Sequence, residues 1–309
     1  MRIASASYMD MLHQSIRDAE GKLGVLTQQI TSGKRINRPS DDPVGASQAL
    51  RAHATLETTL SNQRTLQRAI QLNGALDNAM GDLATPLQTA YNAALKATQP
   101  GLGDAGRAAC AEEVRTAMKR LVTIGNSEFN GTYLLAGTDN REPPLTETGN
   151  PSDVVQYNGD EYPMRISIAP GRTAEITITG QELFNFEDGA GDRPVPAVDD
   201  DIFQVMADLA RDIEIGYTDG INEHMGELQT LQEHVLVERG KLGSYGLRLD
   251  QNLTMAKDGE VQSRTILAEI EDVDLVNALL EVQRQTMAYQ SALAATAQIA
   301  QMPTLFEWL

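Results

Sequence analysis

The sequence predicts a mainly α-helical protein with a β-rich insertion, an α+β fold in which both ends of the chain form one elongated helical rod. Three observations support this fold class. Apolar residues recur at helical spacing over long stretches near both termini. Residues 139–220 contain seven of the twelve prolines, which interrupt helices. Within that block apolar and polar residues alternate, as they do in a half-buried strand.

The composition narrows the possible functions. The chain has 309 residues, enough for about two domains. It carries 25 Lys and Arg residues against 43 Asp and Glu residues, a formal net charge of −18 that argues against nucleic-acid binding through a basic face. Cys110 is the single cysteine, which excludes an intramolecular disulfide and a Cys-based zinc site. The first 20 residues contain no apolar run of signal-peptide length, so ordinary signal-peptide export is not indicated.

The negative charge is concentrated in the middle of the chain. Residues 1–138 have a net charge of +2, residues 139–220 of −13 and residues 221–309 of −7. The central block therefore differs from its flanks in charge as well as in proline content. This difference indicates a separate β-rich unit inserted into a helical one.

The first predicted helix covers residues 5–31. Its apolar residues are spaced alternately 3 and 4 apart over three heptads, the pattern of a coiled-coil seam. At about 1.5 Å per residue, this helix would be roughly 40 Å long. The N-terminal seam consists of Met9, Leu12, Ile16, Ala19, Leu23, Leu26 and Ile30.

A polar loop separates this helix from the next one. Asp42 followed by Pro43 predicts a helix start, because the carboxylate accepts free backbone N–H groups and proline needs no donor at the first helical position. Capping is thus favoured over an acid–base role for the carboxylate pair of Asp41 and Asp42. The residues expected to shape the loop are Gly33, as a left-handed helix end, with Pro39, Asp41, Asp42 and Pro43.

Three helices are predicted after the loop, from residue 44 to Pro86, over 87–98 and over 104–126. In the central block, Met164, Ile166 and Ile168 alternate with polar residues, and so do Ala174, Ile176 and Ile178. Gly171 between these two runs predicts a β-hairpin. Val154–Tyr157, followed by Asn158-Gly159, indicates a further strand and turn.

Helix resumes at Ile202, and a long helical run is expected from Ile221 to about Gln301. Near its end, apolar and small residues again alternate 4 and 3 apart. We expect the two seams to pack against each other, against neighbouring copies of the chain, or both. The C-terminal seam consists of Leu275, Leu279, Val282, Thr286, Tyr289, Leu293, Thr296 and Ala300, with Leu280 widening it.

The 22 residues 285–306 carry no charge. Their length would suit a transmembrane helix, but four glutamines within them are costly in hydrocarbon. Close packing against other helices is the better interpretation. The chain then closes on an apolar segment that contains Leu305, Phe306, Trp308 and Leu309.

The sequence offers little for enzyme chemistry. Residues 101–106 match G-x-G-x-x-G but follow a predicted helix, so the strand–loop–helix context of a dinucleotide site is missing. The four histidines lack metal-ligand spacing, and Asp199-Asp200-Asp201 is better explained as a solvated cap of the Ile202 helix than as a cation site. We expect no catalytic residue, no cofactor and no bound metal, and hence not an enzyme.

The ends of the chain resemble the bacterial flagellin superfamily. The similarity lies in Ser32–Ile36 and Pro39–Gly45, in Asn130–Thr138 and Tyr157–Asp160, and in Ser263–Leu275 with Leu305–Leu309. The Pro-Ser-Asp-Asp-Pro loop resembles hook–filament junction members more than filament flagellins, which usually have Ser-Ala-Lys-Asp-Asp-Ala-Ala-Gly. One departure is Met302-Pro303-Thr304, where the family more often has Ser-Leu before the last segment.

The resemblance implies three layers: a terminal helical assembly domain of residues 1–43 and 262–309, a helical rod domain of 44–138 and 202–261, and an acidic outer domain of 139–201. It implies a structural subunit of the flagellum that joins the hook, through hook-associated protein 1, to the flagellin filament. Its own copies would form a ring or helical layer. A flagellar export chaperone and the type III export apparatus would deliver it outside the cell without a cleaved signal peptide.

Two alternatives remain open at this point. The first is a filament flagellin, against which the 39–43 loop and the 305–309 end argue. The second is a helical membrane-active translocator of a secretion system, against which the glutamine-rich C-terminal segment argues.

Overall fold

The computed structural model describes residues 2–150, 153–169, 171–186 and 201–300. The chain divides into two compact units. Unit 1 comprises residues 1–60 and 258–309, and unit 2 comprises residues 61–257. Most described residues are helical and the strands occur in antiparallel pairs, so the predicted mainly α fold with a small β-rich insertion is confirmed.

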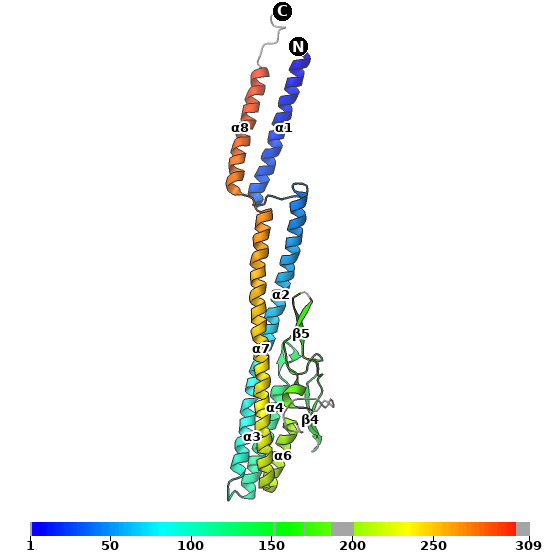
Figure 1. Ribbon diagram of the computed structural model, residues 1–309, viewed down its shortest axis with the longest axis vertical. Helices are drawn as coiled ribbons and strands as arrows, with labels where there is room; N and C mark the ends of the chain where they lie inside the picture. Colours follow the sequence, from blue (N-terminus) through cyan, green and yellow to red (C-terminus); the bar gives the residue numbers. More distant parts are fainter. Residues whose placement is uncertain (1, 151–152, 170, 187–200, 301–309) are drawn as a thin grey trace, which may run out of the picture. The chain divides into compact units, whose positions relative to one another are not determined.

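Unit 1 is built from helices. α1 (Arg2–Ser32) and α8 (Leu275–Ala300) run antiparallel, side by side (Figure 1). The unit also holds the first part of α2 (Pro43–Asp82) and the last part of α7 (Thr218–Glu271). Ala49 from α2 and Leu267 from α7 are buried, which gives this part of the unit a small core.

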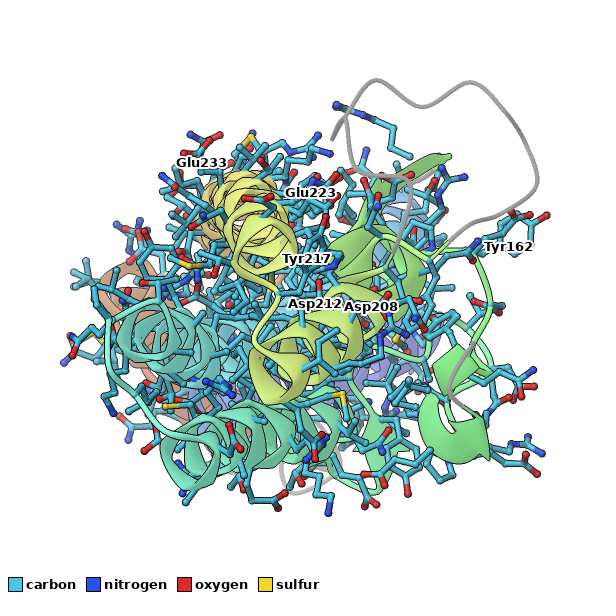
Figure 2. The ribbon with its side chains drawn as sticks, turned by 90° about the horizontal axis from the view of Figure 1, so that it is seen from below. Tyr162, Asp208, Asp212, Tyr217, Glu223 and Glu233 are labelled. Atoms are coloured by element: carbon cyan, nitrogen blue, oxygen red, sulfur yellow. The ribbon has the colours of Figure 1, made fainter. Side chains whose placement is uncertain are left out.

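Unit 2 contains the main hydrophobic core. α3 (Ala84–Ala97) and α4 (Asp104–Gly125) pack against each other, and α6 (Ile202–Ile215) packs on α4. Ile202, Val205, Leu209 and Ile213 of α6 are buried, because they share the face that meets the other helices. Asp201 caps α6 by accepting N–H groups of Phe203 and Gln204 at 2.8 and 2.9 Å, as expected. Figure 2 shows how α6 turns at Tyr217 into α7.

The strands of unit 2 form three hairpins. They pair β1 (Glu128–Phe129) with β2 (Thr132–Tyr133), β3 (Leu145–Asn150) with β4 (Asp153–Tyr157) and β5 (Arg165–Ala169) with β6 (Arg172–Glu175). The predicted hairpin around Gly171 is confirmed, with φ +73° at that glycine. The predicted strand at Val154–Tyr157 is confirmed as part of β4. The short helix α5 (Gly180–Phe184) follows the last hairpin.

The β5–β6 hairpin packs on the helices of unit 2. Ile176, just after β6, is buried with Leu66 and Ala69 of α2 and with Leu249 of α7. Met164, Ile166 and Ile168 lie partly buried against the same cluster. The alternation read from the sequence therefore marks the face that meets the helices.

Asn73 of α2 ties the hairpin to α7. Its side-chain amide donates to the backbone carbonyls of Ile176 and Leu242 at 3.2 and 3.3 Å, and the residue is buried. A Cβ at Gly246 would lie 2.8 Å from the side-chain amide oxygen of Asn73, so a larger residue there would displace this amide.

We expect Asn73→Leu to lower the free energy of unfolding by about 1–3 kcal/mol, because the Ile176 carbonyl loses its buried donor. Urea unfolding followed by circular dichroism measures this loss. Asn78→Leu, at an exposed position of the same helix, is the matched control and should change stability by less than about 0.5 kcal/mol. Equal losses in both variants would show that the Asn73 amide does not carry the effect.

Candidate assembly interface

The loop between α1 and α2 has the structure that its sequence predicts. α1 ends at Ser32, and Gly33 follows with φ +71°, in the left-handed region. The Asp41 carboxylate accepts the N–H groups of Asn37 and Arg38 at 3.2 and 2.8 Å. α2 begins at Pro43, and the Asp42 carboxylate accepts the Gly45 N–H at 2.9 Å. Both aspartates are thus capping groups.

Gly45, in the first turn of α2, lies close to two side chains of the loop. A Cβ there would lie 2.5 Å from the Asp42 carboxylate oxygen and 2.6 Å from Cδ1 of Ile36. The N–H of Gly45 is also the largest cause of the lowered pKa of Asp42, and the guanidinium of Arg35, which donates to the carboxylate at 3.3 Å, lowers that pKa further.

A set of charged residues, which we call the loop clamp, fastens this loop to the end of α7. Its members are Lys34, Arg35, His53 and Glu271. One carboxylate oxygen of Glu271 accepts a hydrogen bond from the Lys34 ammonium at 2.6 Å. The other oxygen lies 2.9 Å from Nε2 of His53. The Arg35 guanidinium donates to the carbonyl of Ile270 at 2.9 Å.

The backbone reinforces the loop clamp. Arg35 N–H donates to the Glu271 carbonyl at 2.6 Å, and Val273 N–H donates to the Gly33 carbonyl at 3.0 Å. Asp274 then caps α8 through the N–H groups of Val276 and Asn277, both at 3.1 Å. The single helical run expected from Ile221 to about Gln301 is therefore wrong. It breaks at 272–274, because these backbone groups bond to the loop and Asp274 starts a new helix.

Glu271 is held in its charged form. Burial by itself would raise the pKa of this carboxyl, but the hydrogen bonds from Lys34 and His53 outweigh it and hold the pKa below its usual value near 4.5. Since the folded protein binds this proton more weakly than the unfolded chain, the clamp's contribution to stability is complete above about pH 4.5. That contribution is lost as the pH falls through the lowered pKa.

We therefore expect acid to release the loop. As the pH falls below 4.5 and through the lowered pKa of Glu271, the amides of Arg35 and Val273 should lose hydrogen-exchange protection, after correction for the intrinsic pH dependence of exchange. Glu271→Gln removes the titrating group and should give weaker protection that depends little on pH. An unchanged acid response in Glu271→Gln would assign the release to another group.

The α1 side of the predicted helix pair is confirmed. Ala19 is buried, and the other described members of the N-terminal seam are half-buried. These are Leu12, Ile16, Leu23, Leu26 and Ile30. Met9 lies in α1, but its side chain is outside the described residues.

Only part of the predicted C-terminal seam lies on the face of α8 that meets α1. Val282, Thr286, Tyr289 and Thr296 are half-buried, but the predicted leucines are not. The buried or half-buried face also includes residues that were not predicted, namely Ala278, Gln285 and Ala292. Small and polar residues suit this face because they let the helices approach closely. Leu275, Leu279, Leu280 and Leu293 instead are between 42% and 52% exposed.

This exposure gives α8 an uncovered apolar face. We call the exposed set the α8 outer face; its members are Leu275, Val276, Leu279, Leu280, Met287 and Leu293. Val276 and Met287 are 70% and 66% exposed. Such a concentration of large exposed apolar side chains on one helix marks an interaction surface. The other predicted assembly residues, Leu305, Phe306, Trp308 and Leu309, and Ala300's side chain, lie outside the described residues.

The described residues were also compared with the requirements of a metal site and of a membrane-spanning helix, beginning with two histidines of unit 2. His224 lies between the carboxylates of Glu227 and Asp212, at 2.9 and 3.3 Å, and His234 bonds to the Glu182 carbonyl at 2.7 Å. Across the described ranges, no group of three or more His, Cys, Asp and Glu side chains is arranged to hold a metal ion. In the same ranges, no helix combines the length and the apolar character needed to cross a membrane.

The loop clamp as a unit could not be predicted from the local sequence. Lys34 and Arg35 belong to the loop segment that carries the family resemblance, but their partner Glu271 is more than 230 residues away. The clamp could have been predicted from two charged segments, one after the first helix and one before the last, because the two ends of the chain were expected to pair.

Comparison with known families agrees with this architecture. Residues 5–140 match the bacterial flagellin N-terminal helical region, and residues 225–308 match the bacterial flagellin C-terminal helical region. The chain belongs to the bacterial flagellin family. Members of this family are structural proteins of the flagellum. The N-terminal match includes α1 of unit 1, and the C-terminal match includes its partner α8.

Individual relatives resemble this flagellin-family protein over nearly its whole length. Flagellar hook-associated protein 3 of Salmonella typhimurium is 25% identical and aligns over 94% of the chain and 95% of its own length. Flagellin of Bacillus subtilis is 23% identical over 89% of the chain and 88% of its own length. A solved structure of a putative flagellar hook-associated protein from Vibrio parahaemolyticus shares the fold, with a TM-score of 0.66 at 14% identity, over 75% of this chain and all of that one.

Proposed function

We propose that this protein is a structural subunit of the junction between the flagellar hook and the flagellin filament. The observation that carries the proposal is the α8 outer face, an apolar surface left uncovered on a helix that the flagellin family match includes. The similarity to hook-associated protein 3, which covers nearly the full length of both chains, favours the junction over other sites in the flagellum.

Assembly would be driven by burial of this face. Covering one large apolar side chain is worth about 1.5–3 kcal/mol, so the six members of the α8 outer face amount to an order of 10 kcal/mol before the costs of association. The loop clamp would hold the helix pair to the end of α7 while this force acts. The terminal residues Leu305–Leu309 and Met9 would extend the same contact.

The partners follow from this role. They are hook-associated protein 1 on the hook side, flagellin on the filament side, and further copies of this chain in a ring or helical layer. A flagellar export chaperone and the type III export apparatus would deliver the protein outside the cell. The proposal includes neither nucleic acid nor membrane insertion. It retains the three proposed layers: an assembly domain of residues 1–43 and 262–309, a rod domain of 44–138 and 202–261, and an outer domain of 139–201.

Deletion of residues 300–309 tests the proposal in a strain that lacks the chromosomal gene. The truncated protein should be produced and keep unit 2 folded, while filaments fail to remain attached to hooks. Immunogold labelling of the full-length protein should mark the hook–filament boundary. Normal filament attachment by the truncated protein, or labelling along whole filaments, would contradict the junction role.

A filament flagellin is the second candidate, favoured by the similarity to Bacillus subtilis flagellin. Electron microscopy of the concentrated protein in negative stain separates the two, because a filament flagellin forms long filaments and a junction subunit does not. The translocator alternative predicts co-flotation with liposomes, for which we expect a negative result.

A further inference from the structure

The outer surface of α7 in unit 2 carries a second uncovered apolar face. Leu236, Val237, Leu247 and Met255 are between 59% and 67% exposed. The exposed positions between them on this face are uncharged, and we call the whole set the α7 stripe. Its remaining members are Gly240, Gly243, Ser244, Gln251 and Thr254. At about 1.5 Å per residue, the stripe is roughly 28 Å long.

Nothing within the described chain requires the two glycines of the stripe. A Cβ built at Gly240 or Gly243 meets no atom within 4 Å. A glycine inside a helix costs about 0.5–1 kcal/mol relative to alanine, so the pair weakens α7 without any internal benefit. Two glycines without side chains, between the exposed Leu236 and Leu247, suit close approach by another helix.

Three basic residues beside the stripe have partners within unit 2. Arg239 makes two hydrogen bonds to Asp77, at 2.7 and 3.0 Å. Lys241 contacts Glu238 at 2.6 Å and Glu182 at 3.1 Å, and the Arg248 guanidinium lies 5.0 Å from the Tyr245 ring centroid. A phosphate-bearing ligand therefore finds no free cation cluster here, and the surface favours a neutral protein partner.

Unit 2 also presents a groove that carries no net charge. A cavity of about 920 Å³ runs between α3 and α4. Its charged residues balance, with Lys96 and Arg120 against Glu112 and Glu113, and Lys96 bridges Glu113 at 3.1 Å. Thr89, Asn92, Thr116 and the 51% exposed Leu95 line it between these charges. The groove runs from Pro86 of α3 to Gln99 just beyond its end, roughly 20 Å, so it could hold about two thirds of the stripe.

We propose that the α7 stripe of one copy docks into the α3–α4 groove of a second copy. The chain as a whole carries a net charge of −18, so copies repel except where neutral surfaces meet. The stripe segment 236–257 is not negative, with four basic and two acidic residues, and the groove charges cancel. Stripe and groove are thus two surfaces at which copies of unit 2 can meet without net repulsion between like charges.

The contact is heterologous, because stripe and groove lie on different elements. In Figure 2, α7 and α4 lie on opposite sides of α6, so one subunit can engage two neighbours at once. Head-to-tail contacts of this kind produce rings or helical layers. The inference rests on the proposed function, which requires copies to assemble, and it names the surfaces that join them. One helix face in one groove falls near or below the roughly 800 Å² per partner of stable complexes, so the isolated pair is weak.

Cross-linking of single-cysteine variants tests the docking. Leu247→Cys lies in the stripe and Thr116→Cys in the groove, and each variant also carries Cys110→Ala to remove the native thiol. Both positions are exposed, so the substitutions leave the core intact. A mixture of the two purified variants at high concentration, treated with a short bismaleimide, should give several-fold more covalent dimer than either variant alone. A second stripe variant carries Leu247→Glu and has Gln251→Cys as its reacting position. Its mixture with the Thr116→Cys variant should give at least fivefold less covalent dimer.

A matched control uses Ile215→Cys, which is 67% exposed at the end of α6 and outside the stripe. Its mixture with Thr116→Cys should give only background dimer. Equal cross-linking by the control, or dimer formation by Leu247→Cys alone that equals the mixture, would overturn the heterologous contact. The second result would mean that the stripe pairs with itself.

The same variants, expressed together in cells, separate this inference from the proposed function. If the protein is present in isolated flagella but stripe and groove do not cross-link, the docking is wrong and the junction role stands. If the protein is absent from flagella, the junction role fails, and the purified mixture still decides the docking.

Discussion

Val276→Glu combined with Leu280→Glu should leave the isolated protein folded and abolish its assembly into flagella. Both side chains belong to the α8 outer face and are 70% and 48% exposed, so neither is part of a buried core. A glutamate in the first turn of α8 also interacts favourably with the helix N-terminus. In an assembled interface, each substitution removes about 1.5–3 kcal/mol of apolar burial and adds a charge that must be desolvated. The combined loss corresponds to roughly a 100-fold or greater weakening of each contact.

Motility and the attachment of filaments measure this effect in cells, and thermal unfolding of the purified variant measures its fold. Ile215→Glu is the matched control, because it places the same charge on a 67% exposed apolar position at the end of α6. The control should support normal motility. If the α8 double variant also assembled normally, the exposed leucines and valine would not form the interface, and the proposed function would lose the observation that carries it.

The α8 outer face also shows where sequence reasoning succeeds and where it fails. On α1 the predicted seam is the buried one, because its apolar residues form one narrow stripe with one partner. On α8 the predicted seam is divided, because its leucines stay exposed within this chain. Ala278, Gln285 and Ala292 meet α1, while the bulkier side chains point outward. Hydrophobic periodicity identifies a face that is to be buried, but it does not say whether the same chain buries it.

The loop clamp marks a second boundary of what local sequence predicts. The caps at Asp41 and Asp42 were predictable, because their partners lie within four residues. The break between α7 and α8 was not, since Val273 bonds to Gly33 across the chain. Only the pairing of the two termini brings those groups together. The family resemblance supplied that pairing in outline, without the residues that make it.

Phe203→Ala should cause the largest loss of stability of any single substitution considered. Phe203 is fully buried at the start of α6, with its ring centroid 5.2 Å from that of Phe184 and 5.8 Å from that of Phe186. Phe186 in turn stacks on Tyr157 of β4 at 5.6 Å. The Phe203 ring therefore joins α6, α5 and the β3–β4 hairpin, and its removal leaves a cavity at the point where they meet.

Truncating such a ring typically costs about 3–5 kcal/mol. For a unit of this size, that loss corresponds to a fall in Tm of roughly 10 °C. Calorimetry gives the Tm, and urea unfolding followed by circular dichroism gives the free energy. Tyr162→Ala, at a 63% exposed aromatic position, is the control and should shift stability by less than about 0.5 kcal/mol. Because Phe203 links the β-rich insertion to the helices, the substitution should also expose the β3–β4 and β5–β6 hairpins to protease before α1 and α8 are affected. A loss below about 1 kcal/mol, or equal protease sensitivity in both units, would show that the insertion folds independently of this aromatic cluster.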